Sequence, residues 1–500
     1  MLIRPRHNDF RIIGLYTGKV LIGLALLMMV PLAMALSFGE WNPAIDFAIA
    51  VGACLSFGLA SEIICQTTQE PKWSHGLVIA CFSWFAATML GAIPHWLSGH
   101  FGSFIDALFD VMSGYTTTGL YLIQDLDHIS NSLNMWRHLL TYVGGQGIIV
   151  VALTFLFRGS AGAYKMYVGE GKDERLLPNV IRTARAIWLV SLAYLVVGSL
   201  ALWMTGVAIG QSPLRSLLHA IWVFMGAWST GGFAPQSYNT FYYHSLAYEI
   251  ICVVIFVVGS FNFALHWSLW TGRRSELWKD IEMISFTATL TVAMIVATAG
   301  LMQLGVYTDS VALFRKMSYQ LFSAHTTTGF GTIYSRTFVR QWGPLAMLGV
   351  ILAMAIGASA CSTAGGFKGI RMGIIFMAVI QEIRRMILPE TARIVQKWHH
   401  VTTRVLDDST VRAAMLIVLS FIATYSIGTL VGVFYGYDLM DSLFDAVSAG
   451  SNTGLSCGLT SPSMPTGMKI VYILMMWAGR LEFLSIFALT GYVVALVRGR

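Results

Sequence analysis

Charged residues are scarce in this sequence. Asp, Glu, Lys and Arg together make up 11% of its 500 residues, whereas hydrophobic residues make up 56%. Soluble globular domains carry about 25% charged residues, which cover their surface in water. A soluble enzyme, a disordered chain and a nucleic-acid-binding domain are therefore poor descriptions of this chain. The composition predicts a polytopic membrane protein.

The sequence also lacks paired cysteines and the motifs of nucleotide-binding or catalytic proteins. Its six cysteines contain no CxxC pair and lie mostly within apolar runs, which predicts buried thiols rather than a disulfide framework or a zinc site. No P-loop, GxGxxG in a βαβ context, HExxH or nucleophile elbow is present. We therefore expect a chain that is not an enzyme and that binds no nucleotide itself.

Ten apolar segments are long enough to cross a bilayer, which requires about 20 mostly apolar residues. They are residues 12–36, 44–65, 76–98, 135–157, 186–209, 246–270, 283–305, 343–375, 411–435 and 467–497. An even number of spans places both termini on one side of the membrane. The segments on that side hold 23 of the 32 Lys and Arg residues, and the opposite loops hold five. This asymmetry predicts that both termini are cytoplasmic.

Four loops between these spans share one pattern. Residues 99–134, 210–245, 306–342 and 436–466 each contain an apolar stretch of about 10–14 residues, which is too short to span a bilayer. Aligned on one glycine, the loops read MSGYTTTGL, MGAWSTGGF, FSAHTTTGF and VSAGSNTGL. Four copies at equivalent positions indicate an internal repeat.

The repeat predicts the fold. We expect an all-α polytopic membrane protein in which two N-terminal helices precede four helix–pore loop–helix repeats, arranged pseudo-fourfold around one ion pore. The two N-terminal helices are expected within residues 1–75. The four repeats are expected at 76–180, 181–280, 281–405 and 406–500, and the third contains an intramembrane gating loop.

The loop residues suit a monovalent cation. Backbone carbonyls replace the water shell of such an ion without a fixed counter-charge that would hold it too tightly. Glycine permits positive φ and a close approach of the backbone, and the C-terminal end of each short helix favours a cation. Asp106 and Asp441 lie near the N-terminal ends of two of these helices, either to complement the helix dipole or to bind an ion.

The TTTG, STGG, TTTG and SNTG loops resemble those of the Trk/Ktr/HKT superfamily of cation transporters, and the two leading helices resemble its TrkH/TrkG branch. The resemblance implies potassium uptake across the bacterial inner membrane, with K⁺ as the transported ion. It also implies a homodimer and a cytoplasmic TrkA-like nucleotide-binding regulatory ring. The basic segments 158–185 and 379–412 are expected to dock that ring or anionic membrane lipid.

Position by position, the resemblance implies that three residues of each loop line the ion path. They are Thr117, Thr118, Gly119, Thr230, Gly231, Gly232, Thr327, Thr328, Gly329, Asn452, Thr453 and Gly454. In the plant relatives a serine at the first glycine position accompanies sodium preference, so Gly119 favours potassium. Asn452 departs from the other loops, and the strictness of selection for K⁺ over Na⁺ stays open.

Ten small residues at 357–366 interrupt the eighth span. Glycine in a helix costs about 1 kcal/mol relative to alanine, so this segment is either a close helix-packing surface or a break in the helix. The superfamily has a gating loop at the equivalent place. The residues expected in it are Gly357, Ser359, Ser362, Thr363, Gly365 and Gly366.

Arg480 is a charged residue deep within the last span, where a charge is energetically unfavourable and is a candidate for function. Glu482 is too close in sequence to Arg480 to lie on the same helix face. The partner of Arg480 is therefore expected elsewhere in the fold. A structural ion pair is one interpretation. The resemblance implies the other, in which Arg480 lies just below the filter and restrains the gate.

A secondary transporter that couples K⁺ to H⁺ or Na⁺ is the alternative function. Such proteins usually have inverted repeats and ionisable residues at the midplane, whereas these repeats share one orientation and the filter stretches contain no carboxylate. The outer loops are poor in Lys and Arg but carry aspartates, seven of which predict an acidic pore mouth that concentrates cations. These seven are Asp106, Asp110, Asp125, Asp127, Asp438, Asp441 and Asp445.

Overall fold

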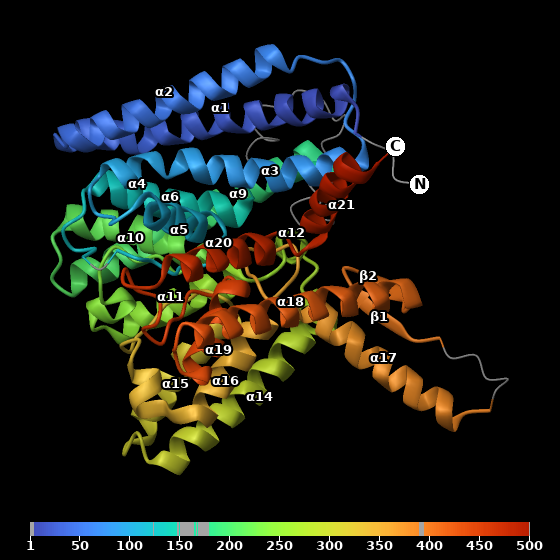
Figure 1. Cartoon of the computed structure of the whole chain (residues 1–500). Helices are drawn as coiled ribbons and strands as arrows, with labels where there is room; N and C mark the ends of the chain where they lie inside the picture. The colour runs from blue at the N-terminus through green and yellow to red at the C-terminus, as the bar shows by residue number, and fades with distance from the viewer. Residues whose placement is uncertain are drawn as a thin grey trace.

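The computed structural model describes residues 5–123, 125–147, 150, 165–166, 168, 180–389 and 395–499, and most of these residues lie in helices (Figure 1). Most of the basic segment 158–185 lies outside the described residues, as does most of the end of the span expected at 135–157. Two long helices precede the repeats. α1 (His7–Phe38) and α2 (Trp41–Ile64) form a hairpin along one side of the molecule, at the top of Figure 1.

The remaining elements follow in four groups. The first group comprises α3 (Trp73–Gly91), α4 (Ile93–Leu97), α5 (Phe104–Tyr115) and α6 (Asn131–Gln146). The second comprises α9 (Val180–Ala208), α10 (Pro213–Trp228), η1 (Asn239–Tyr243), α11 (Leu246–Gly259), α12 (Phe263–Trp270) and α13 (Glu276–Lys279). The third comprises α14 (Ile281–Leu304), α15 (Ser310–His325), η2 (Phe338–Trp342), α16 (Gly343–Ile356), α17 (Gly369–Ile387), β1 (Lys397–His400) and β2 (Thr402–Val405). The fourth comprises α18 (Asp408–Phe434), α19 (Leu439–Gly450), α20 (Thr466–Arg480) and α21 (Leu484–Arg498).

One short helix in each group leads into a glycine loop. These helices, α5, α10, α15 and α19, are 12 to 16 residues long, which is too short to cross a bilayer. Three begin with a side-chain cap, as Ser103, Asp309 and Asp438 accept hydrogen bonds from backbone N–H groups of the first turn. All four end in the buried interior, so their C-terminal carbonyls face the centre of the molecule.

Seven helices in the described part of the chain are long and apolar enough to cross a membrane, and two bent helix pairs raise the number to nine. The tenth expected span, 135–157, is described only as far as α6 and a few residues beyond it. The span expected at 343–375 is broken as predicted, because α16 ends at Ile356 and α17 begins at Gly369.

Two spans expected to be continuous are instead sharply bent. The helices of the span at 246–270 meet at 99°, and those of the span at 467–497 meet at 111°. At the first bend Asn262 starts a new helix by accepting a hydrogen bond from the N–H of Ala264 at 2.7 Å. At the second bend Glu482 and Phe483 adopt left-handed backbone, with φ of 49° and 64°. Gly259 ends the helix before the first bend and Gly479 lies in the last turn before the second, but neither glycine was expected to mark a bend.

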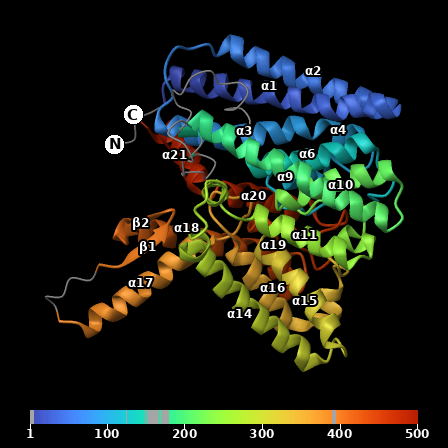
Figure 2. The same cartoon turned by 180° about the vertical axis from the view of Figure 1, so that it is seen from behind.

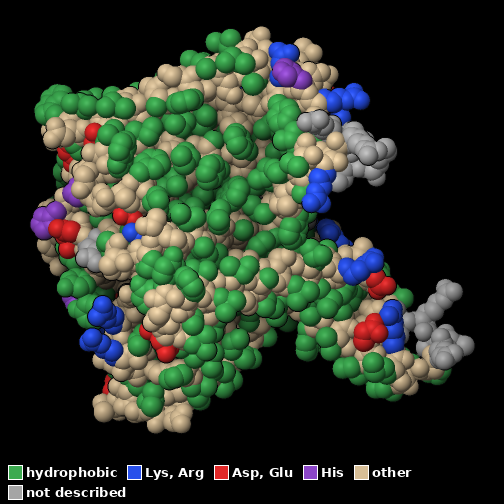
Figure 3. All heavy atoms as spheres, in the orientation of Figure 1, with side chains coloured by type: hydrophobic (Ala, Val, Ile, Leu, Met, Phe, Trp, Pro, Cys, Tyr) green, Lys and Arg blue, Asp and Glu red, His purple; other side chains and the backbone are tan. Residues whose placement is uncertain are grey.

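The surface fits a bilayer. Figure 3 shows hydrophobic side chains over the middle of the molecule, with charged side chains gathered toward its two ends. Leu26, Val196, Ile295 and Leu419 are among the large hydrophobic side chains left exposed on outer helices. Both termini lie at the end of the molecule from which α17 and the β1–β2 hairpin project, as the two opposite views show (Figure 2).

Candidate functional site

The four glycine loops, defined as residues 116–119, 229–232, 326–329 and 451–454, leave their helices with the same hydrogen bonds. In each loop the N–H of the residue before the final glycine donates to a carbonyl five residues earlier. The pairs are Thr118–Ser113 at 2.8 Å, Gly231–Gly226 at 2.9 Å, Thr328–Ser323 at 2.8 Å and Thr453–Ser448 at 2.9 Å. The sequence repeat is therefore also a repeat of backbone conformation.

Left-handed backbone recurs at two positions of every loop. The second residue, which is Thr117, Thr230, Thr327 or Asn452, has φ between 49° and 57°. The fourth residue is the aligned glycine, with φ between 64° and 92°. Glycine adopts such angles freely, whereas a residue with a Cβ loses about 1–2 kcal/mol there. The positive φ at the glycines was expected, but the strain at the preceding polar residues was not.

The loops close into a ring in chain order. A Cβ on Gly119 would lie 2.6 Å from the carbonyl oxygen of Gly231 in the second loop. Equivalent Cβ atoms on Gly232, Gly329 and Gly454 would each lie 2.1 Å from a carbonyl oxygen of the next loop. The oxygens they would meet belong to Thr328, Thr453 and, closing the ring, Thr118. Every predicted ion-lining residue therefore lies in one ring of backbone.

Hydroxyl groups tether the loops from behind. Thr116 and Thr118 share a hydrogen bond of 2.8 Å, and the equivalent pairs in the third and fourth loops have lengths of 2.8 and 2.7 Å. In the second loop Gly231 has no hydroxyl, and Ser229 instead bonds Thr141 of α6 at 2.9 Å. Each glycine loop is thus held in place by polar side chains of the protein.

Asn452 connects two loops directly. Its side-chain nitrogen donates to the hydroxyl of Thr118 at 3.0 Å and to the carbonyl of Met476 at 2.9 Å. The residue that departs from the pattern of the other loops therefore bonds the fourth loop to the first. A threonine at this position is too short to make both of these hydrogen bonds.

One mouth of the ring is a small polar cavity of about 160 Å³. Three of the four ring glycines contribute to its wall, together with Asn239 of η1 and Gln320 of α15. Among the described residues no carboxylate lines this cavity, so the expected aspartates do not form its wall.

Three of the seven aspartates expected at the mouth are buried in polar contacts instead. Asp106 pairs with Lys469 of α20 at 2.6 Å, and Asp110 contacts Arg137 of α6 at 3.2 Å. The carboxylate of Asp445 accepts hydrogen bonds from N–H or O–H groups of Ser456, Cys457 and Thr460. These carboxylates fix α5 and α19 to their neighbours, because a buried charge must be paired or hydrogen-bonded.

Sequence reasoning did not identify Lys469 and Arg137, which pair with the buried Asp106 and Asp110. Both are buried, with 6% and 0% of their surface exposed. A cation within or beside an apolar span was the available signal. Their partners lie 363 and 27 residues away in the chain, so pairing could not be read from local spacing.

The broken segment of the third group, residues 357–368, lies against the ring. We call it the intramembrane loop. The hydroxyl of Thr117 donates to the carbonyl of Thr363 at 3.4 Å, and that of Thr230 donates to the Thr363 hydroxyl at 3.1 Å. The N–H of Gly365 donates to the hydroxyl of Thr327 at 2.7 Å.

The fourth glycine loop is also touched. A Cβ on Gly365 would lie 2.0 Å from the carbonyl oxygen of Ser451. The intramembrane loop therefore lies against all four glycine loops at once. Backbone that is not helical is stable at this depth because its polar groups are bonded by protein.

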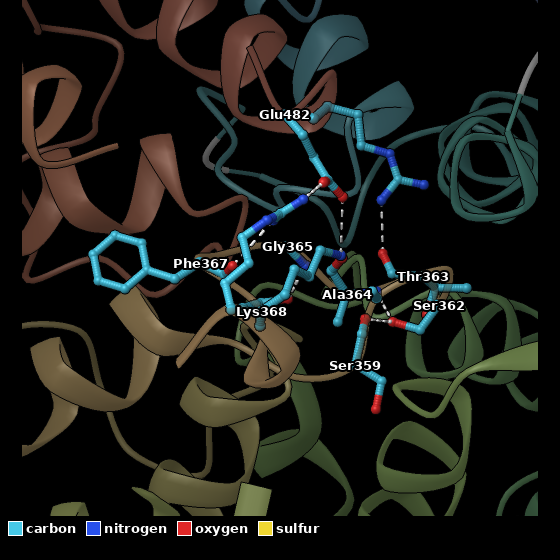
Figure 4. A network of polar contacts seen from close by, with 12 residues as sticks. Ser359, Ser362, Thr363, Ala364, Gly365, Phe367, Lys368 and Glu482 are labelled. Carbon is cyan, nitrogen blue, oxygen red and sulfur yellow. Dashed lines mark hydrogen bonds and ion pairs between the residues drawn. The ribbon is translucent and has the colours of Figure 1, made fainter. Parts of the chain in front are cut away.

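Charged residues hold the base of the intramembrane loop (Figure 4). Lys368 donates to the carbonyl of Ala364 within the loop, and its ammonium group lies 3.8 Å from the carboxylate of Glu482. Arg371 of α17 pairs with the other oxygen of Glu482. Glu482 at the bend of α20–α21 thus joins the last repeat to both the loop and α17.

Arg480 ends α20 just before this bend. Its guanidinium donates to the carbonyl of Thr363 at 2.8 Å and to those of Gly144 and Gly145 at 2.6 and 3.1 Å. The expectation that its partner lies elsewhere in the fold is confirmed, because these carbonyls belong to the first and third groups of elements. Arg480 therefore bonds the same carbonyl of the intramembrane loop that faces Thr117.

Comparison with known proteins supplies the family. The TrkH family model, described as a cation transport protein, matches residues 44–491. An uncharacterized cation transporter of Methanocaldococcus jannaschii is 30% identical over 475 residues, covering 94% of this chain and 93% of the relative. The Trk system potassium uptake proteins TrkH and TrkG of Escherichia coli K12 are each 26% identical, covering 96% of this chain and 98% of the relative.

A solved structure has the same fold. The crystal structure of the potassium transporter TrkH from Vibrio parahaemolyticus matches with a TM-score of 0.79 at 24% identity, and the match covers 96% of this chain and 98% of that chain. The predicted fold class is therefore confirmed.

Proposed function

As the chain belongs to the TrkH family of cation transport proteins, we propose that it takes up K⁺ across the inner (plasma) membrane of a bacterial cell. The family is one of transporters, not of enzymes. Relatives named as potassium uptake proteins match over nearly the whole chain, which supports K⁺ as the transported ion.

The closed ring of glycine loops carries this proposal. Its carbonyl groups, including those of Thr118, Gly231, Thr328 and Thr453, supply neutral oxygens around one axis. Such a ring suits a monovalent cation, which must exchange its water shell for protein oxygens and still leave. The twelve predicted ion-lining residues are proposed to act as the selectivity filter.

The intramembrane loop is proposed to be the gate. It spans the ring axis beneath the hydroxyls of Thr117, Thr230 and Thr327, so ions can pass only when it moves. Arg480 holds the carbonyl of Thr363 and places positive charge beside the ion path. A cation leaving the ring is repelled by this charge, which supports a restraining role.

The regulatory partners proposed are a second copy of the chain and a TrkA-like nucleotide-binding ring. One end of the molecule bears the termini, α17 and the β1–β2 hairpin. We propose that this end faces the cytoplasm and docks the TrkA-like regulatory ring. The sequence excess of Lys and Arg on this side supports that orientation. Regulation by nucleotides would act through the TrkA-like ring, because no nucleotide-binding motif occurs in this chain.

Flux of Rb⁺ into proteoliposomes tests the proposal, with the reversal potential measured across an imposed pH gradient. Passive conduction predicts saturable Rb⁺ uptake and a reversal potential that follows the Rb⁺ gradient alone. A reversal potential that follows the proton gradient would replace this proposal with coupled secondary transport. Absence of any Rb⁺ flux from well-folded protein, with and without a regulatory ring, would reject K⁺ transport.

A further inference from the structure

Three ligating side chains gather outside the ion path, at the end of the molecule that bears the termini. Asp280 caps α14, Glu282 lies in its first turn, and His400 ends β1. The ring nitrogen Nδ1 of His400 lies 2.9 Å from Asp280 and 3.9 Å from Glu282, and the ligating atoms all lie within 4.8 Å of one another. All three residues are buried, with 2–3% of their surface exposed.

Neighbouring groups orient each of these side chains. Oδ1 of Asp280 accepts the N–H of Glu282 at 2.8 Å, and Oε1 of Glu282 accepts the N–H of Ala360 at 2.6 Å. The side-chain nitrogen of Asn262 lies 3.4 Å from Nε2 of His400, on the far side of the imidazole ring. Both oxygens of Asp280 lie 2.9–3.0 Å from Nδ1 of His400, and the second oxygen of Glu282 lies 3.9 Å from it. Metal-ligating carboxylates are commonly held by outer hydrogen bonds such as those from the N–H groups of Glu282 and Ala360.

We propose that Asp280, Glu282 and His400 bind a divalent transition-metal cation such as Zn²⁺, Mn²⁺ or Co²⁺. One imidazole nitrogen and two carboxylate oxygens match the ligands these ions prefer, whereas Mg²⁺ and Ca²⁺ favour oxygen alone. Ligand atoms on one such ion lie roughly 3–4 Å apart, given metal–ligand bonds of about 2.0–2.2 Å. Two carboxylates also match the charge of a divalent ion.

An entry path reaches the cluster. His400 lines a cavity of about 730 Å³ that extends between α17, α18 and the β1–β2 hairpin and is bordered by Ala360. Water in this cavity would fill the coordination positions that the three side chains leave open. The site therefore has a route to solvent although its ligands are buried.

The cluster is coupled to the intramembrane loop. Glu282 bonds the N–H of Ala360 in that loop, and His400 belongs to the hairpin that follows α17. A metal ion shared by α14 and the hairpin fixes both against the loop in its position below the ring. The expected effect is a lower ion flux, and this regulatory step, unlike the binding itself, depends on the proposed gate.

Titration of the purified full-length protein with Co²⁺ tests the site, because Co²⁺ bound through a histidine nitrogen gives visible absorption bands. Wild-type protein is expected to show these bands with a stoichiometry of one ion per chain and to lose them when Zn²⁺ is added. Asp280→Asn, Glu282→Gln and His400→Ala are each expected to weaken binding at least tenfold.

His399→Ala is the matched control, since His399 neighbours His400 but pairs with Glu276 at 2.7 Å outside the cluster. It is expected to bind Co²⁺ as wild type does. Absence of Co²⁺ bands in folded wild-type protein would overturn the site, whatever the variants do. Equal loss in His399→Ala and His400→Ala would also overturn it, because the effect would then belong to the hairpin as a whole.

Rb⁺ flux then separates binding from regulation. Addition of Co²⁺ to the hairpin side is expected to lower flux in wild type and to leave His400→Ala unaffected. Co²⁺ binding without any change in a measurable Rb⁺ flux would overturn the regulatory step. Flux that is absent under all conditions would reject the proposed transport function while the binding result stands by itself.

Discussion

At the scale of single residues, the glycine loops combine permissive and strained backbone. Glycine at 119, 232, 329 and 454 gives the ring its close contacts, while four polar residues with a Cβ are held at positive φ. Strain of this kind persists only where surrounding bonds over-determine it. Here the repeated N–H bonds and the hydroxyl tethers perform that role.

Gly119→Ser tests the ring geometry. The added side chain starts 2.6 Å from the carbonyl of Gly231, so the ring must widen or tilt that oxygen. We expect discrimination of Rb⁺ against Na⁺ to fall about tenfold, which corresponds to about 1.4 kcal/mol. Competitive flux in proteoliposomes measures it.

Gly331→Ser is the control for this substitution. It lies just beyond the third glycine loop, where the nearest atom to an added Cβ is an ordinary 3.5 Å away. Its selectivity should match that of wild type. Unchanged selectivity in Gly119→Ser would show that the ring does not select the ion at the position of Gly119.

Arg480→Ala tests the electrostatic restraint on the intramembrane loop. The substitution removes donors from the carbonyls of Thr363, Gly144 and Gly145 and removes the positive charge beside the ion path. We expect basal Rb⁺ flux to rise severalfold. Arg498→Ala, at the exposed end of α21, should leave flux unchanged. Lower flux in correctly folded Arg480→Ala would contradict the restraint.

At the scale of elements, the bend between α20 and α21 brings a carboxylate to the base of the intramembrane loop. Glu482 meets Lys368 and Arg371 because residues 481–483 leave the helical path. If the last helix were straight, Glu482 would not lie beside Lys368 and Arg371. The bend is therefore part of how the fourth repeat controls the loop of the third.

Glu482→Gln is expected to loosen this element. Removal of one partner from a buried ion pair typically costs about 3–5 kcal/mol, because it leaves an uncompensated charge. We expect a lower thermal unfolding temperature and a higher basal flux. Glu382→Gln is the control, since Glu382 pairs with Arg385 at an exposed site, where ion pairs contribute about 0–1 kcal/mol. Equal stability of the two variants would show that Glu482 has no anchoring role.

At the scale of the whole molecule, two large clusters of buried hydrophobic residues stabilise the fold. One joins α1, α3, α6 and α9 to α11, and the other joins α14, α16, α19 and α20. The short helices before the glycine loops draw on both clusters. The buried residues that α10 contributes belong to the first cluster and those of α19 to the second, whereas α5 and α15 contribute buried residues to each.

The orientation of the molecule is testable by labelling. Ser37→Cys lies at the tip of the α1–α2 hairpin, and Thr402→Cys lies in the β1–β2 hairpin at the opposite end. An impermeant maleimide applied to intact cells is expected to label Ser37→Cys, and Thr402→Cys only after permeabilisation. Wild-type protein gives the background from native cysteines. The reverse pattern would contradict cytoplasmic termini.

Some of the site could be predicted because it is written in local sequence. The four glycine loops recur as short strings, and the ten small residues at 357–366 are visible as a run. Both signals depend on backbone freedom, which is a property of the residue itself. The burial of Asp106, Asp110 and Asp445 could not be predicted in this way, since burial and pairing depend on which residues pack against them.

The sequence by itself determined the membrane environment, the fourfold repeat and the break in the eighth span, because composition, periodicity and glycine content act locally. Only the tertiary structure decided the bends at 260–262 and 481–483, the pairing of Lys469 with Asp106 and the meeting of His400 with Asp280. These features join residues far apart in the chain. Their stability comes from charges and polar groups that find partners only after the helices have packed.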